Sequence, residues 1–234
     1  MPEFNLNLLI DPNQDLPLIK AAQLNIILAK PIGGGAPNVA WQSFDPFPDN
    51  NVEWTEEYGL YASTTQVNNG ARITKMSTTG YPAQSGAYYS FTSNATFNGP
   101  ITDGNVPPAN SYKIVNDMPS SQYPALTFGL MQSASINGVA AQFRPINAQT
   151  VLSKLDVTFT PLTTVYVWLQ AQLVSETVIT SVTSRHTKVT FGGPITSHTL
   201  KYDRNTGMFV AVSGKEKAFI HDAPNVELVR QAIA

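Results

Sequence analysis

The stretch Leu126-Thr-Phe-Gly-Leu130, with the runs that follow it, decides the fold class of this chain. About 31 residues after it begins comes Val157-Thr-Phe-Thr160, and Val165-Tyr-Val-Trp-Leu169 follows. The first half has a similar order, in which Leu24-Asn-Ile-Ile-Leu28 leads, about 28 residues later, to Val52-Glu-Trp-Thr55. Short runs rich in β-branched and aromatic residues are typical of strands. The matching order predicts two similar β units.

Turn residues separate these runs at the spacing expected of a β-sandwich. Asn68-Asn-Gly70, Ile136-Asn-Gly-Val139 and Asn205-Thr-Gly207 are strong hairpin signals because Asn and Gly tolerate positive φ. Residues 4–10 and 24–30 are predicted strands, and 39–44 is expected to return as the partner of 24–30. The fold class predicted is all-β, built from two similar antiparallel β-sandwich units or one large sandwich.

Two short helices complete the predicted organisation. The first passes through Leu18 and Ala22, with Asp11 or Asn13 as its cap, and the second covers residues 225–234. We divide the chain into an N-terminal sandwich unit at 1–100 and a linker at 101–123, rich in Gly and Pro. A C-terminal sandwich unit with the terminal helix follows at 124–234.

Composition narrows the function classes. Charged residues make up 13% of the chain, the net charge is −2 and cysteine is absent. The sequence pI is about 5.9 and basic residues are scattered, so nucleic acid is not an expected partner. A surface built from Ser, Thr, Asn and Gln repels its own copies weakly, which favours self-association. The absence of cysteine, of a signal peptide and of a long apolar run leads us to expect a cytoplasmic protein.

Residues able to do chemistry are few. The histidines His186, His198 and His221 lack the spacing of metal ligands, so no metal, cofactor or catalytic residue is assigned. Glu53, Glu56 and Glu57 stand beside Trp54, a grouping found in sugar-cleaving clefts, but the preferred interpretation is that Glu56 and Glu57 form a solvated strand end.

A Thr- and Ser-rich stretch at 177–191 has the composition of the hairpins that pore-forming toxins insert into membranes. A spanning strand needs about 9–11 residues with one apolar face. Arg185 and Lys188 interrupt this stretch, and an ordinary strand protected by these charges accounts for the same residues.

Aromatic residues on and near a proline-stiffened loop form the candidate interaction surface. Phe44 and Phe47 flank Asp45-Pro46, and rings on rigid loops make good contacts with a partner. Together with Trp54 and Tyr58 they are the residues predicted to meet that partner. Packing in the core is the alternative role for such rings.

The overall composition is similar to that of soluble microbial β-sandwich proteins that accumulate in cells, such as inclusion-body proteins, fruit-body lectins and defence toxins. The leading hypothesis is a non-enzymatic protein that acts through its surfaces and associates with itself as a homo-oligomer or ordered assembly. A carbohydrate-binding lectin or a pore-forming toxin, which would bind glycans or a membrane surface, is the alternative. An enzyme using the glutamate group comes third.

Overall fold

The structure is a computed structural model that describes residues 3–180, 182, 184–212 and 220–221. Strands account for 51% of the described residues and helix for 3%, which confirms the all-β prediction. The strands sort into four sheets, of nine, five, four and two strands. Within these residues, no helix combines the length and apolar character that crossing a membrane requires. The helix predicted at 225–234 lies outside the described residues.

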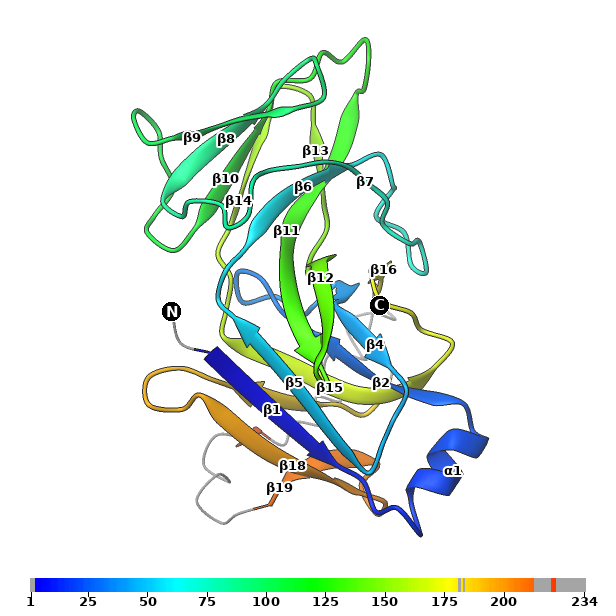
Figure 1. Cartoon of the computed structure of the whole chain (residues 1–234). Coiled ribbons are helices and arrows are strands. Elements are labelled where there is room, and N and C mark those ends of the chain that lie inside the picture. Colours follow the sequence, from blue (N-terminus) through cyan, green and yellow to red (C-terminus); the bar gives the residue numbers. More distant parts are fainter. Residues whose placement is uncertain (1–2, 181, 183, 213–219, 222–234) are drawn as a thin grey trace.

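The nine-stranded sheet runs the length of the molecule (Figure 1). Its order is β19-β18-β1-β5-β11-β6-β7, and β12 and β13 also pair with β11. The strands are β1 (Glu3–Leu9), β5 (Asp49–Thr55), β6 (Gly59–Ser63), β7 (Lys75–Thr78), β11 (Ala125–Ile136), β12 (Val139–Pro145), β13 (Gln149–Leu152), β18 (Ser197–Asp203) and β19 (Met208–Ala211). The long strand β11 pairs with β6 along its first half and with β5 at its end, so it joins the two ends of the molecule.

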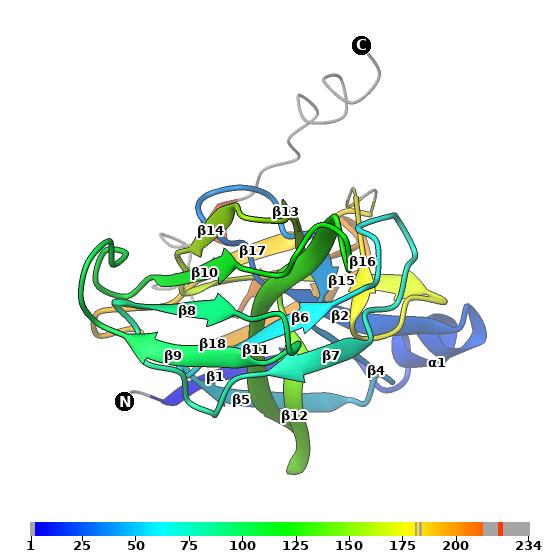
Figure 2. The same cartoon turned by 90° about the horizontal axis from the view of Figure 1, so that it is seen from above.

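The other sheets pack against this one. The five-stranded sheet has the order β20 (Ile220–His221), β17 (Thr187–Thr190), β15 (Thr164–Ala171), β2 (Leu24–Ala29) and β4 (Gln42–Phe44). The four-stranded sheet has the order β14 (Asp156–Phe159), β10 (Tyr112–Asn116), β8 (Ala87–Phe91) and β9 (Phe97–Ile101). The smallest pairs β16 (Thr177–Val178) with β3 (Val39–Ala40), and α1 (Leu16–Ala21) precedes β2. Figure 2 looks down on the end of the molecule where β8, β9 and β10 lie side by side.

Alternation along β1 shows how the sequence forms the core. Phe4, Leu6 and Leu8 are buried, whereas Asn5 and Asn7 between them are half-buried on the opposite face. Successive strand residues point to opposite faces, so each apolar residue packs against the five-stranded sheet and each Asn faces outward. One large cluster of buried apolar side chains includes residues of all three larger sheets.

Strands from the two predicted units are hydrogen-bonded to each other. β1 pairs in parallel with β18, β2 pairs with β15, and β5 and β6 both pair with β11. The range 101–123, predicted as a linker, contains β10, which lies between β8 and β14. The ranges 1–100 and 124–234 therefore share sheets instead of each closing its own, because backbone groups of the first half find their partners in the second.

Local turn predictions agree with the structure. Asn137 and Gly138 have φ of 51° and 79° and join β11 to β12, as expected of a hairpin turn with two positive φ values. β18 and β19 pair across the turn that contains Gly207, and β4 returns beside β2. The Asp11 carboxylate accepts the backbone N–H groups of Asn13 and Gln14, each at 2.9 Å, in the turn before α1. The predicted helix cap is wrong, because the N-cap residue is Asp15 and its side chain makes no capping hydrogen bond.

Candidate functional site

The four residues predicted as an interaction surface do not share one surface. Trp54 is 4% exposed and Tyr58 is 2% exposed, so neither ring is available to a partner. Trp54 lies on the inner face of β5, where its ring centroid is 5.0 Å from that of Phe191 and 5.8 Å from that of Trp41. Phe44 is half-buried, whereas Phe47 is 49% exposed. Of the predicted surface, Phe47 is the ring that faces solvent.

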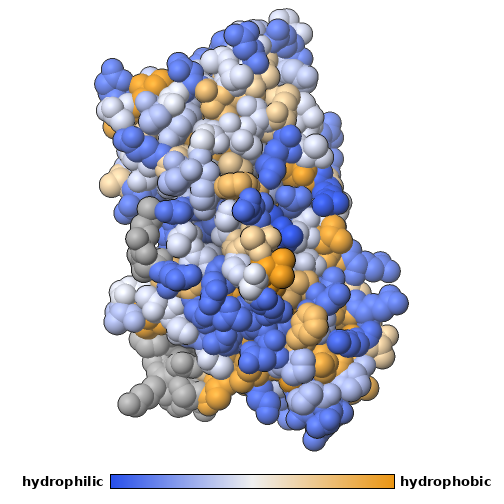
Figure 3. All heavy atoms as spheres, viewed as in Figure 1, coloured by the Kyte–Doolittle hydropathy of each residue, from blue (hydrophilic) through white to orange (hydrophobic). Residues whose placement is uncertain are grey.

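Phe47 borders an open hollow of about 640 Å³ over the outer face of β1 and β5. The hollow is lined by Asn7, Phe47, Pro48, Asp49, Asn51 and Asn137. Hydrophilic residues gather over these two strands on the face drawn in Figure 3. The lining therefore combines three amide side chains, one carboxylate, one aromatic ring and the proline ring of Pro48.

Hydrogen bonds fix the amides of the hollow in place. Asn51 Nδ2 donates to Asn7 Oδ1 at 2.9 Å, because the two residues are paired across β1 and β5. The backbone N–H of Asn51 donates to Asn137 Oδ1 at 2.7 Å, and the N–H of Asn137 donates to the Asn51 carbonyl at 2.8 Å. The β11–β12 hairpin is thereby attached to β5. The orientation of the three amides is set before any ligand arrives.

A buried asparagine holds the loop that carries Phe47. Asn50 is fully buried, and its Oδ1 accepts the N–H of Phe47 at 2.9 Å. Its Nδ2 donates to the carbonyls of Phe47 at 2.8 Å and Leu8 at 2.9 Å. With both prolines of this loop restricting φ, Phe47 has a fixed backbone. Lys20 Nζ lies 5.5 Å from the ring centroid and adds a positive charge at the edge of the hollow.

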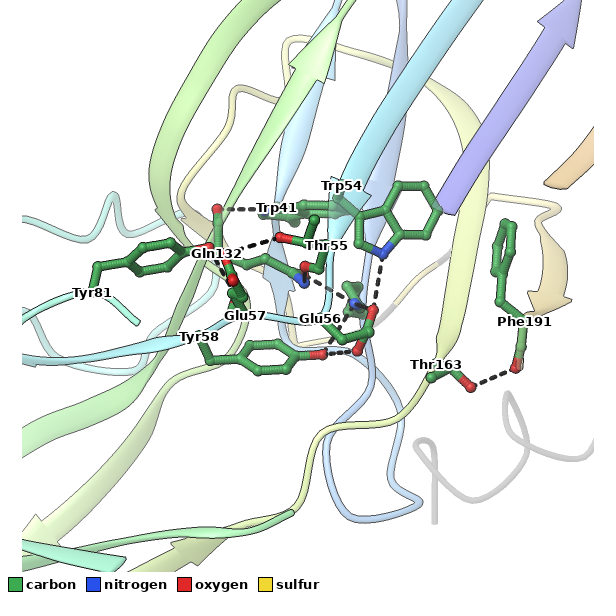
Figure 4. Close-up of polar contacts among 11 residues, drawn as sticks. Trp41, Trp54, Thr55, Glu56, Glu57, Tyr58, Tyr81, Gln132, Thr163 and Phe191 are labelled. Atoms are coloured by element: carbon green, nitrogen blue, oxygen red, sulfur yellow. Dashed lines mark hydrogen bonds and ion pairs between the residues drawn. The ribbon is translucent and has the colours of Figure 1, made fainter. Parts of the chain in front are cut away.

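A second polar group lies inside the protein, around Lys30. Lys30 follows β2, and its side chain is 1% exposed. Its Nζ lies 2.8 Å from Glu56 Oε1 and 2.9 Å from Gln132 Oε1 on β11, with the Tyr58 hydroxyl at 3.3 Å. The rings of Trp41, Trp54 and Tyr58 surround the ammonium, with centroids 5.4 to 5.6 Å away. Figure 4 shows Glu56 and Tyr58, from the segment between β5 and β6, converging with Gln132 from β11.

Burial and hydrogen bonding set the protonation of this group. Burial lowers the pKa of Lys30, although the Glu56 carboxylate opposes the shift. Burial alone would raise the pKa of Glu56, but the Lys30 ammonium and the hydrogen bonds from Tyr58 and Trp54 outweigh it, so that pKa is lowered. Burial, reinforced by the negative charge of Glu56, raises the pKa of Tyr58 well above its ordinary value.

The three glutamates considered as an enzymatic group have separate surroundings. Glu56 is in the buried pair with Lys30, while Glu53 accepts Asn5 Nδ2 at 3.1 Å on the outer face of β5. The Glu57 carboxylate accepts the Thr55 hydroxyl at 3.3 Å. None of the three lines the hollow beside Phe47.

The histidines and the Thr-rich stretch are also placed by the structure. His198 is buried on β18, where its Nε2 lies 3.1 Å from the Thr190 carbonyl and its ring stands against Phe191. His186 lies beside Tyr166, and nothing is described of the His221 side chain. In the described part of the chain, no three His, Asp or Glu side chains gather as metal ligands. The stretch 177–191 contributes β16 and β17 to two different sheets.

Sequence reasoning missed Asn50, Lys30 and Gln132. Asn50 is one of two adjacent Asn residues after Pro48, and Lys30 reads as the charged end of a strand. Gln132 lies on β11 next to a register shift in its pairing with β12, which no local sequence pattern predicts.

Comparison with protein-family models, with characterised proteins and with solved structures finds no match. The function is therefore argued from the site itself.

Proposed function

We propose that this protein recognises carbohydrate in the hollow formed by Asn7, Phe47, Asp49, Asn51 and Asn137. The observation that carries the proposal is the set of fixed amides beside an exposed ring. Sugar hydroxyls donate and accept hydrogen bonds at once, and amide side chains offer both functions. The C–H face of a sugar packs on an aromatic ring, which Phe47 supplies.

Hydrogen-bonding capacity remains in the hollow for a ligand. The Nδ2 groups of Asn7 and Asn137 and the carboxylate of Asp49 make no hydrogen bond within the described part of the chain. Two donors and one charged acceptor are thus held around a space of about 640 Å³, which accommodates one or two sugar rings. Because these groups are already ordered, binding costs little side-chain entropy.

A glycan array probed with the labelled full chain tests the proposal. We expect binding to a subset of glycans, competition by the matching free sugar, and loss of binding in Asn137→Ala. Glu53→Ala, an alteration on the same outer face but outside the hollow, serves as the matched control and should bind normally. Absence of binding to every glycan, or equal loss in both variants, would count against the hollow.

Self-association is a second candidate, favoured by one apolar patch. Leu152 and Leu155 are each more than half exposed at the turn between β13 and β14, and Tyr123 is 39% exposed beside them. The Ser153 N–H donates to the Pro124 carbonyl at 2.9 Å, which keeps Tyr123 near this turn. Exposed apolar groups on a surface with few charges favour contact between copies.

Light scattering of the purified protein tests self-association. We expect a mass well above 25.4 kDa for the natural chain and a monomer for Leu152→Ser with Leu155→Ser. A change of Val174, an exposed residue elsewhere, to Ser is the control and should leave the mass unchanged. A monomer over the whole concentration range would remove this candidate.

A further inference from the structure

An amine, a primary amide and a carboxylate meet in the interior between the nine-stranded and five-stranded sheets. Lys30 Nζ is 2.9 Å from Gln132 Oε1 and 2.8 Å from Glu56 Oε1. Lys30 and Gln132 are both essentially inaccessible to solvent. Lys30 and Glu56 alone would make an ion pair. The primary amide of Gln132, which accepts a hydrogen bond from the same Nζ, is an additional group.

We propose that Lys30 and Gln132 become joined by an intramolecular isopeptide bond, with Glu56 as the proton carrier. Nζ of Lys30 bonds to Cδ of Gln132, and the bond from Cδ to Nε2 breaks. The products are a secondary amide between the two side chains and one ammonia. No oxidant, reductant or further reactant is required.

The first step makes the amine a nucleophile. A protonated lysine has no lone pair, so its proton must leave before attack. Glu56 Oε1 is placed to accept that proton at 2.8 Å. Burial lowers the pKa of Lys30 and so eases loss of this proton, whereas the lowered pKa of Glu56 makes the neutral pair a transient state from which attack must occur. A neutral amine beside a neutral carboxylic acid is the reactive form.

The second step uses the fixed position of the amide. Gln132 Nε2 donates to the Thr55 carbonyl at 2.6 Å, and the Gln132 backbone carbonyl accepts Trp41 Nε1 at 3.1 Å. The amide carbonyl oxygen is thus held 2.9 Å from Nζ, and the adjacent Cδ is the atom that Nζ must reach to form the bond. As the tetrahedral intermediate collapses, Nε2 takes the proton that Glu56 carries and leaves as ammonia.

The surroundings protect this reaction from water. Trp41, Trp54 and Tyr58 form an aromatic enclosure around Nζ, so water does not compete for the amide carbon. The Glu56 side chain is 17% exposed and marks the route by which ammonia reaches solvent. Of the three protons on the lysine ammonium, one stays on the new amide and one reaches Nε2 through Glu56. The third protonates the released ammonia to ammonium, and Glu56 is left ionised.

The bond would tie the end of β2 to the middle of β11, residues 102 positions apart. A covalent link over so long a loop restricts the unfolded chain strongly, as a disulfide does. The chain has no cysteine and so cannot form a disulfide, and the proposed bond would be a covalent cross-link of another kind.

The intact mass of the denatured full-length natural chain tests the proposal. We expect a mass lower than that of the sequence by one ammonia. Trypsin does not cut before proline, so Lys30 stays inside fragment 21–72 and Gln132 inside fragment 114–154. We expect these two fragments to migrate as one cross-linked species whose fragmentation places the link at Lys30 and Gln132.

Three results would overturn the proposal. One is a mass equal to that of the sequence. Another is loss of water within fragment 21–72, which would place the link between Lys30 and Glu56. A third is loss of ammonia confined to one fragment, as a succinimide at Asn69-Gly70 or Asn137-Gly138 would give.

Variants test the role of Glu56 separately. Glu56→Gln keeps both groups to be joined but removes the proton carrier, so we expect full loss of the cross-linked fragment. Glu53→Gln, a change on the outer face of β5, is the matched control and should cross-link fully. Full cross-linking in Glu56→Gln would refute the role of Glu56, and the mass of the natural chain decides the proposal even if that variant does not fold.

Discussion

Lys30 and Glu56 form an ion pair with 2.8 Å between Nζ and Oε1, in which the lysine side chain is 1% exposed and the glutamate side chain 17%. The pair connects the end of the five-stranded sheet at β2 to the segment between β5 and β6. A charge held in such a place depends on its partner, because removal of the partner leaves the other charge buried and uncompensated.

Replacement of Glu56 should therefore destabilise the protein strongly. We expect Glu56→Ala to lower the free energy of unfolding by about 3–5 kcal/mol, since it leaves the Lys30 ammonium unlinked and without a counter-charge and also removes the acceptor for Trp54 and Tyr58. Glu53→Ala should cost no more than about 1 kcal/mol, because its carboxylate makes one half-buried hydrogen bond. Urea titrations of both variants provide the comparison, and equal midpoints would contradict the structural role given to Glu56.

Asn50 should matter for both stability and recognition. Its side chain makes three hydrogen bonds while fully buried, and Asn50→Ala removes all three. We expect a cost of about 2–3 kcal/mol and weaker glycan binding, because the Phe47 loop loses its anchor. Asn105→Ala, at an exposed loop position, should change neither quantity. Thermal unfolding and glycan titration measure the two effects.

Phe47 should contribute to affinity without contributing much to stability. Phe47→Ala removes the ring from the hollow, and we expect glycan affinity to fall by about tenfold, or about 1.4 kcal/mol. The midpoint of thermal unfolding should move little, because the ring is half exposed already. Tyr123→Ala removes an exposed ring far from the hollow in sequence and serves as control in the same calorimetric titration. An equal loss of affinity in both variants would count against ring packing at Phe47.

Gly129 on β11 has no room for a side chain. A Cβ atom there would lie 2.1 Å from the Asn147 carbonyl oxygen and 2.7 Å from the Tyr61 ring. We expect Gly129→Ala to cost about 3 kcal/mol or to prevent folding, since backbone must move to relieve the overlap. A Cβ at Gly80 meets no atom within 4 Å, so Gly80→Ala should be neutral. Soluble yield and denaturant midpoints separate the two variants.

Buried tyrosines should make the fold sensitive to alkaline pH. Burial raises the pKa of Tyr112 to about 12 and raises the pKa values of Tyr58 and Tyr61. In the unfolded chain these hydroxyls ionise from about pH 10. The folded state then binds more protons than the unfolded one, so their contribution is complete below about pH 10 and is lost as the pH rises through the folded pKa values.

Where Lys30 is a free amine, its lowered pKa acts in the opposite direction, because the unfolded lysine binds the extra proton, but one group opposes three. We expect the melting temperature to decline above about pH 10, with tyrosinate absorbance appearing together with unfolding. Ionisation of these tyrosines well before unfolding would contradict their burial.

Much of the fold could be predicted because its signals are local. Alternation of Phe4, Leu6 and Leu8 with Asn residues defined β1, and Asn137-Gly138 defined the β11–β12 turn. Neither signal contains information about which distant strand lies alongside. The parallel pairing of β1 with β18, and the strand β10 inside the predicted linker, were therefore not anticipated.

The candidate site was predicted in part for the same reason. The rigid loop identified Phe47. Trp54 lies on the buried face of β5, where alternate residues point inward, but the sequence alone did not reveal which face of β5 is buried. The sequence places Asn50 in a loop, whereas the structure places it on β5, where its side chain makes three hydrogen bonds.

By itself, then, the sequence determined that the chain is all-β, where its main hairpins turn, and that a proline-stiffened loop presents a phenylalanine. The tertiary structure decided that the two halves share their sheets, that three asparagines and Phe47 border one hollow, and that Lys30, Glu56 and Gln132 meet in the interior. The physical reason is range: strand alternation and turn geometry depend on neighbours in sequence, whereas Lys30 meets partners 26 and 102 residues away through packing of whole sheets.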